Sequence, residues 1–164
     1  MWEKFLEEKI FDYSSVVTAI TRWRIKNKNI VFTNGCFDLI HLGHIKYLMQ
    51  AANQGDQLIV GINSDDSVCR LKGEHRPIND EISRMHVIAS LFCVSGIVLF
   101  KEDTPLELIR IIKPDILVKG GDYQPDEVVG ADVVKSNGGE VKILDFIPGY
   151  SSTSIEQKIR NQTS

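Results

Sequence analysis

The sequence predicts an α/β protein built on a single doubly wound parallel sheet. Short apolar runs rich in β-branched residues alternate along the chain with segments whose apolar residues recur at helical spacing. This alternation is typical of parallel strands that are joined by crossover helices. A chain of 164 residues is also long enough to bury a core of its own. We therefore expect one five-stranded sheet covered by helices.

The expected strands follow from the positions of the apolar runs, at about residues 29–33, 57–62, 97–100, 116–118 and 141–144. Right-handed crossovers restrict their possible orders, and 3-2-1-4-5 is the commonest solution for five strands. In this order the first and fourth strands are neighbours at the switch point of the sheet. The Gly-Cys-Phe-Asp turn at 35–38 and residues 119–122, which follow these two strands, are then expected to face each other.

Helices are expected before, between and after the strands. Asp12 or Ser14 can cap a helix that runs through about Asn27. Thr104 is expected at the N-cap of a later helix, with Pro105 and Glu107 in its first turn. One helix is expected after the turn that follows the first strand, ending at Gly55. Others are expected over about 80–93 and 126–136, and after a capping box at 153–156. The side chains expected on buried helix faces include Val16, Val17, Ile20, Trp23, Ile82, Met85, Ile88, Ala89 and Phe92.

In domain terms, residues 1–28 are interpreted as an N-terminal helical extension and residues 29–164 as the α/β domain. The first dozen residues of the extension would form a short helix. Residues 69–79 carry several basic side chains and are expected to form a charged loop. No repeat or low-complexity segment interrupts the domain.

Composition argues against several classes of function. The formal net charge of −3 and the lack of a basic run predict no nucleic-acid partner. The three cysteines, Cys36, Cys69 and Cys93, have no paired spacing, which favours a reducing compartment over a disulfide framework. The first residues do not form a signal peptide, and no apolar run approaches the roughly 20 residues that a membrane span needs. We therefore expect a cytoplasmic protein with no membrane partner.

The stretch Asn34–His44 is the strongest candidate for a functional site. It follows a buried strand and opens a helix, where backbone N–H groups can bind an anion. His41 and His44 stand three residues apart and can point into one site, where neutral imidazoles can donate hydrogen bonds to phosphate. The same spacing also suits a metal site completed by Cys36 or Asp38, or histidines with local partners. The spacing alone leaves these readings open.

The motif Gly35-Cys36-Phe37-Asp38-x-x-His41-x-Gly43-His44 resembles the signature of the cytidylyltransferase-like nucleotidyltransferases, relatives of the class I tRNA synthetase catalytic domain. The resemblance extends from about residue 29 to 159. It includes residues 63–73, 76–77, 84, 119–123 and 149–155. Within the family, these motifs are most similar to those of the adenylyltransferase domain of ADP-heptose synthases. The resemblance implies a Rossmann-like nucleotidyltransferase fold for residues 29–164.

The resemblance implies an in-line displacement at the α-phosphorus of ATP. A phosphate oxygen of D-glycero-β-D-manno-heptose 1-phosphate would attack, and pyrophosphate would leave. Magnesium fits this reaction because it binds mainly through substrate phosphates. A separate sugar kinase would supply the 1-phosphate. A homodimer is also implied, to which Trp2, Phe5 and Phe11 would contribute.

Other readings of the same residues are a glycerol-3-phosphate or other polyol-phosphate cytidylyltransferase, a nucleotide-binding module without catalysis, and a zinc protein that uses His41 and His44. Cytidylyltransferases of this group usually carry Arg-Thr-x-Gly-Ile-Ser before the last helix. The matching residues 146–151 lack this arginine, which favours the heptose branch.

The resemblance also implies roles for individual residues, carried over by position. His41 and His44 would hold the triphosphate and stabilise the transition state, and Lys46 and Arg84 would add phosphate contacts. Nucleotide binding would fall to Thr33, Gly35, Cys36, Phe37, Asp38, Gly43, Lys119, Gly120, Asp122, Ser151, Ser152 and Thr153. The sugar phosphate would be bound by Asn63, Asp65, Lys72 and Arg76. The resemblance does not assign the metal ligands.

Overall fold

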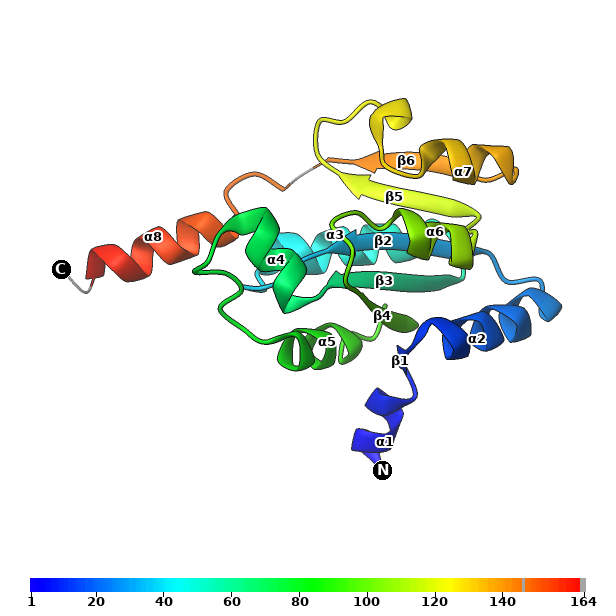
Figure 1. The fold of residues 1–164 in the computed structure, drawn as a ribbon, viewed down its shortest axis with the longest axis horizontal. Coiled ribbons are helices and arrows are strands. Elements are labelled where there is room, and N and C mark those ends of the chain that lie inside the picture. Colours follow the sequence, from blue (N-terminus) through cyan, green and yellow to red (C-terminus); the bar gives the residue numbers. More distant parts are fainter. Residues whose placement is uncertain (146, 163–164) are drawn as a thin grey trace.

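In the computed structural model, which describes residues 1–145 and 147–162, the core is a parallel sheet with helices on both faces (Figure 1). Among these residues the sheet has six strands in the order β1-β4-β3-β2-β5-β6. The strands are β1 (Ile10–Phe11), β2 (Ile30–Gly35), β3 (Gln57–Asn63), β4 (Gly96–Phe100), β5 (Ile116–Gly120) and β6 (Glu140–Leu144). Phe146, in the stretch that lacks the family arginine, lies outside the described residues.

The predicted order of the five main strands is confirmed, but the predicted number of strands is wrong. The additional strand is β1, in which Ile10 lies opposite Ile97 and Phe11 opposite Val98 of β4. A strand of two residues is too short to show an alternation of apolar and polar side chains, so the sequence pattern gives no sign of it. A glycine on β4 makes the pairing possible, because a Cβ atom on Gly96 would lie 2.7 Å from the Phe11 ring.

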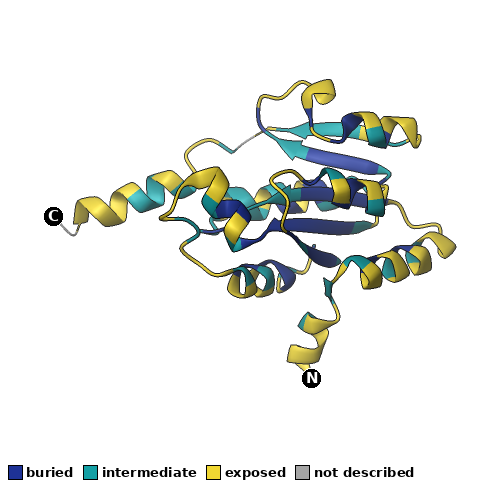
Figure 2. Ribbon diagram, viewed as in Figure 1, coloured by how far each residue is buried: buried dark blue, intermediate teal, exposed yellow. Residues whose placement is uncertain are grey.

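Each face of the sheet carries its own apolar core. Helices α2 (Tyr13–Ile25), α6 (Leu106–Ile112) and α7 (Ala131–Ser136) cover the face that includes Phe32. Helices α3 (Leu42–Ala52) and α5 (Glu81–Ala89) cover the face that includes Val31. Adjacent residues of one strand thus point into different cores, as the pleat requires. Buried residues are concentrated in the central strands, and the outer faces of the helices are exposed (Figure 2).

The remaining elements are α1 (Trp2–Glu7), α4 (Asp65–Lys72), the 3₁₀ helix η1 (Pro125–Glu127) and α8 (Ser152–Gln162). The first 28 residues therefore contribute a strand as well as helices. None of the described helices has the combination of length and apolarity that crossing a bilayer requires.

Several local predictions need correction. Residues 69–72 belong to α4 rather than to a loop, because Ser64 caps that helix by accepting a hydrogen bond from the Ser67 amide. Val17, Ile82 and Phe92 are exposed rather than buried. Helical periodicity identifies an apolar face, but the packing of the neighbouring elements decides how much of that face is covered.

Two of the three predicted caps also differ from the structure. Asp12 caps α2 as predicted, in a reciprocal box with Ser15. By contrast α6 begins at Leu106, after Pro105, without a side-chain cap from Thr104. At the start of α8, the Ser151 hydroxyl accepts a hydrogen bond from the Ser154 amide, which replaces the predicted box at 153–156.

Candidate active site

The predicted functional stretch forms the turn between β2 and α3, at the carboxyl end of the central strand. Phe37 adopts a left-handed backbone conformation there, with φ of 49°. Its ring folds back over Gly35, where an added Cβ atom would lie 2.9 Å from the ring. A glycine at this position therefore leaves room for the Phe37 ring.

The two histidines of the turn stack on each other. The ring centroids of His41 and His44 are 3.8 Å apart with an interplanar angle of 25°. Phe37 meets His44 edge-on at 5.5 Å, and Tyr150 lies parallel to His41 at 6.4 Å. Gly43 leaves room for this stack, because a Cβ atom there would lie 2.9 Å from Nδ1 of His41. The structure thus brings together residues that lie more than 100 positions apart in the sequence.

The surroundings of the stack keep both imidazoles neutral. Burial and the neighbouring His41 lower the pKa of His44 to about 4, and burial also lowers the pKa of His41. Nδ1 of each ring is buried and makes no hydrogen bond to the described residues. Burying Nδ1 without a hydrogen-bond partner costs less free energy when that nitrogen carries no proton. We therefore assign the proton of each ring to Nε2. Each ring can then offer one neutral Nε2–H donor to an anion.

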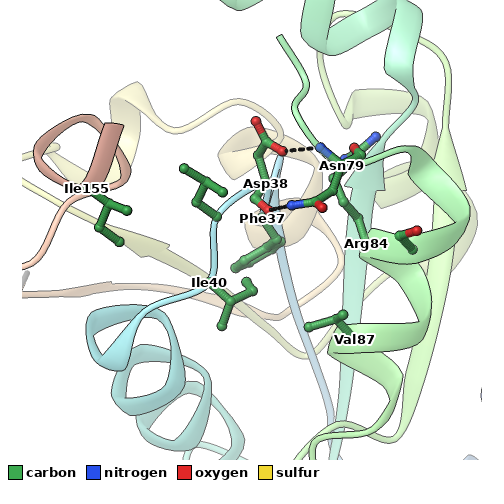
Figure 3. A pocket seen from close by; sticks show the side chains of 9 residues that line it. Phe37, Asp38, Ile40, Asn79, Arg84, Val87 and Ile155 are labelled. Atoms are coloured by element: carbon green, nitrogen blue, oxygen red, sulfur yellow. Dashed lines mark hydrogen bonds between the residues drawn. The ribbon is translucent and has the colours of Figure 1, made fainter. Parts of the chain in front are cut away.

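The chain's own donors occupy the Asp38 carboxylate. It accepts hydrogen bonds from the backbone amides of Ile78 and Asn79 and an ion pair from Arg76 at 2.6 Å. The amide of the Asn79 side chain also donates to the Asp38 carbonyl oxygen at 2.7 Å (Figure 3). Burial alone would raise the pKa of Asp38, but these donors hold it below its usual value. Asp38 therefore ties the histidine turn to residues 76–79.

Arg84 lies beneath the turn and is only 1% exposed. Its guanidinium donates to the carbonyl oxygens of Asn79, Cys36 and Asn63 at 3.1, 2.7 and 2.8 Å, and it pairs with the Asp65 carboxylate at 2.7 Å. Two of the predicted sugar-phosphate ligands, Asn63 and Asp65, are thus bound by Arg84, which was itself predicted to contact phosphate. All these contacts join the ends of β2 and β3 to the start of α4.

The end of β5 faces the turn, as the strand order predicts. Burial lowers the pKa of Lys119, and the positive charge of Lys72 lowers it further. The Lys119 ammonium lies 6.0 Å from the centroid of the Tyr123 ring. Gly120 ends the strand beside it, and the following Asp122 is exposed, as are Lys46 and Lys72.

The buried hydroxyl of Thr33 is 2.6 Å from the hydroxyl of Tyr47, which also donates to the carbonyl oxygen of Val118. Thr33 therefore links β2 to α3 and β5 through Tyr47. Cys36 is partly buried, and this burial raises the pKa of its thiol. The backbone of Cys36 is held by Arg84.

The start of α8 completes the site. The Ser152 hydroxyl donates to the carbonyl oxygen of Leu39 at 3.1 Å, and Thr153 is exposed. Sequence reasoning did not single out Tyr150, Tyr47 or Asn79. Tyr150 could have been identified from the sequence, because it belongs to the motif at 149–155. Tyr47 and Asn79 carry no motif signal, and their importance depends on partners that only the fold brings near.

Two further features bear on possible ligands. An apolar cavity lies beside the turn, between α5 and α8, with Phe37, Ile40, Val87 and Ile155 in its wall (Figure 3). The histidines do not line it. Within the described part of the chain, no group of three or more His, Cys, Asp or Glu side chains could hold a metal ion. The described residues therefore do not form a metal site made of protein ligands alone.

A doubly wound sheet with a glycine- and histidine-containing turn at its switch point defines an α/β domain of the nucleotide-binding class. The model of the cytidylyltransferase-like family matches residues 32–158, and the chain belongs to this family.

Individual relatives agree with this assignment. Over 153 residues the chain is 52% identical to the bifunctional protein HldE of Geobacter metallireducens, an alignment that covers 93% of this chain and 31% of that protein. The chain thus spans about a third of the length of the curated relatives that it matches. A crystal structure of a lipopolysaccharide core biosynthesis protein from Thermoplasma volcanium is 34% identical, with a TM-score of 0.59, covering 73% of this chain and 97% of that one.

A more distant structure shows the same fold. It is the pantoate-beta-alanine ligase of Francisella tularensis in complex with beta-gamma ATP and beta-alanine, with a TM-score of 0.62 and 18% identity. The alignment covers 92% of this chain and 76% of that one.

Proposed function

We propose that this chain transfers AMP from ATP to D-glycero-β-D-manno-heptose 1-phosphate and releases ADP-heptose and pyrophosphate. The observation that carries the reaction class is the stacked pair of neutral histidines at the opening of α3, beside Tyr150, which lies just before α8. The proposed acceptor rests on the resemblance to ADP-heptose synthases. Similarity to the HldE proteins and to a lipopolysaccharide core biosynthesis protein supports it.

In the proposed reaction, a phosphate oxygen of the sugar phosphate forms a bond to the α-phosphorus of ATP. The bond from this phosphorus to its bridging oxygen breaks, and the electron pair leaves with pyrophosphate. The attacking oxygen is already anionic, so no general base is needed. The remaining task is to position the two substrates and stabilise the charge that develops on the phosphates.

The residues of the site suit this task. The Nε2–H donors of His41 and His44 would hold the triphosphate and stabilise the charge that builds in the transition state. The amides that open α8, together with the hydroxyls of Ser151 and Thr153, would bind the β- or γ-phosphate. Lys46 and Lys72 are exposed cations that would attract the sugar phosphate or pyrophosphate. Magnesium would enter bound to the phosphates of ATP.

A substrate panel tests the proposal. Purified protein is incubated with ATP or CTP and with heptose 1-phosphate or glycerol 3-phosphate, and released pyrophosphate is measured. We expect turnover with ATP and heptose 1-phosphate, and little with glycerol 3-phosphate. Faster turnover with CTP and glycerol 3-phosphate would instead make the chain a polyol-phosphate cytidylyltransferase. Absence of turnover with every pair, despite ATP binding, would favour a nucleotide-binding module.

We also propose a source of the acceptor, a cellular compartment and an oligomeric state. A sugar kinase would supply the acceptor, and the reaction would take place in the cytoplasm. The chain would form a homodimer to which Trp2 and Phe5 contribute, since both are exposed near the N-terminus. Phe11, which was also expected to contribute, packs instead against Gly96 and Trp23 of the same chain. Light scattering on a Trp2→Ser, Phe5→Ser variant tests the dimer, because loss of these side chains should then yield a monomer of about half the mass.

A further inference from the structure

Helix α8 is attached to the domain in an unusual way. It extends away from the sheet, and none of its residues is buried (Figures 1 and 2). Apolar packing therefore contributes little to its position. This matters because the first residues of α8 face the histidine turn, so the geometry of the site depends on the contacts that hold the helix.

The main polar contact is a two-sided ion pair at Arg76. One nitrogen of its guanidinium is 2.6 Å from the Asp38 carboxylate, and another is 3.0 Å from the Glu156 carboxylate. The Arg76 side chain is 17% exposed, and those of Asp38 and Glu156 are 6% and 25% exposed. Partial burial makes these pairs stronger than fully exposed ones. Arg76 thus connects the histidine turn directly to the second turn of α8.

Two further contacts act in the same place. The Ser152 hydroxyl donates to the Leu39 carbonyl oxygen, one residue beyond Asp38. Ile155 reaches the wall of the apolar cavity, across from Ile40 and Val87 (Figure 3). The arginine bridge and these two contacts fall on one face of α8, toward residues 38–40.

We propose that Arg76 is a positioning residue that sets the start of α8 at the correct distance from His41 and His44. Both ends of its guanidinium are already occupied by carboxylates. A substrate phosphate would have to share the guanidinium with two carboxylates, whose negative charges oppose its binding, whereas a positioning role uses the contacts as they stand. This inference rests on the proposed function, because it assumes that the start of α8 and the histidines bind one polyphosphate.

The test compares Arg76→Gln, Glu156→Gln and the double variant with a control, Arg110→Gln. The control removes an exposed ion pair with Glu107 on α6, which lies on the opposite face of the sheet. Hydrogen exchange of the α8 amides is measured in the free protein, and KM for ATP and kcat are measured in turnover. Hydrogen exchange reports on the helix whether or not the substrate assignment is correct.

We expect each single variant to speed exchange of the α8 amides by at least about tenfold, since each breaks the Arg76–Glu156 pair. Arg76→Gln also leaves Asp38 without its cation, and Glu156→Gln also breaks the Glu156–Arg160 pair within α8. KM for ATP should rise by a similar factor, with a smaller change in kcat. The effect of the double variant should be smaller than the product of the two single effects, because the Arg76–Glu156 pair is already broken in each single variant. Arg110→Gln should leave both measurements unchanged.

Unchanged exchange in the Glu156→Gln protein would overturn the inference. So would a loss of ATP affinity in Arg76→Gln that Glu156→Gln does not share, because Arg76 would then bind the substrate directly. If exchange increases but no nucleotide pair gives turnover, the bridge is established and only the proposed function fails.

Discussion

Replacing Arg84 by methionine should destabilise the fold, because this side chain joins three segments beneath the histidine turn. The substitution keeps a similar volume but removes every donor. It leaves the carbonyl oxygens of Cys36, Asn63 and Asn79 without their partner and the Asp65 carboxylate without its cation. The Arg84 side chain is fully buried, so the compensation from water is small.

The expected loss can be worked from these contacts. Hydrogen bonds from a charged donor contribute about 1.5 kcal/mol or more each, so the three bonds to carbonyl oxygens account for roughly 4–5 kcal/mol. The Asp65 carboxylate is 38% exposed and is partly rehydrated in the variant, so losing its ion pair adds only about 1 kcal/mol or less. We therefore expect the free energy of unfolding to fall by about 5 kcal/mol. Urea denaturation followed by circular dichroism measures this loss.

Arg70→Met is the matched control. Arg70 pairs with Asp103, but both side chains are at least half exposed, so the loss should stay below about 1 kcal/mol. If Arg84→Met unfolds at the same urea concentration as the parent chain but loses turnover, the reasoning is wrong. Arg84 would then act on the substrate, as the family resemblance implies.

Three further predictions concern the histidine stack. His44→Ala should lower the rate of pyrophosphate release by roughly 10²–10³-fold without unfolding the chain, because it removes one donor to the transition state; near-normal turnover would refute this role. Gly43→Ala should also slow turnover, by about tenfold or more, because its methyl group would press on His41 and Tyr150; a crystal structure of the variant should show the His41 ring displaced. Finally, the free energy of unfolding should fall as the pH drops from about 6.5 to about 4. In this window His44 is protonated in the unfolded chain, whereas burial holds its folded pKa near 4, so the unfolded state binds more protons. Urea denaturation at several pH values measures this slope, and His44→Ala should reduce it; an unchanged slope would mean that other groups cause it.

Much of the fold was open to prediction because its signals are local. Each of the five longer strands is an apolar run bounded by polar residues or glycine, and the crossover rule leaves few orders for such strands. The position of the histidine turn followed from the same pattern, since a strand and a helix on either side place it at the carboxyl edge. The strand β1 escaped prediction because two residues carry no periodicity, and its pairing depends on the close approach of Phe11 to Gly96.

The environments of the charged residues in the site could not be predicted in this way. Arg76, Arg84 and Asp38 have the residue types that phosphate and cation sites use, and the sequence places them in family motifs. Their partners lie far away along the chain: Arg84 contacts Cys36, and Arg76 contacts Glu156. A guanidinium binds whichever oxygens surround it, and only the packing of α5 and α8 against the turn brings these oxygens together. Local sequence therefore determined where the histidine turn forms, whereas long-range packing decided which charged groups support it.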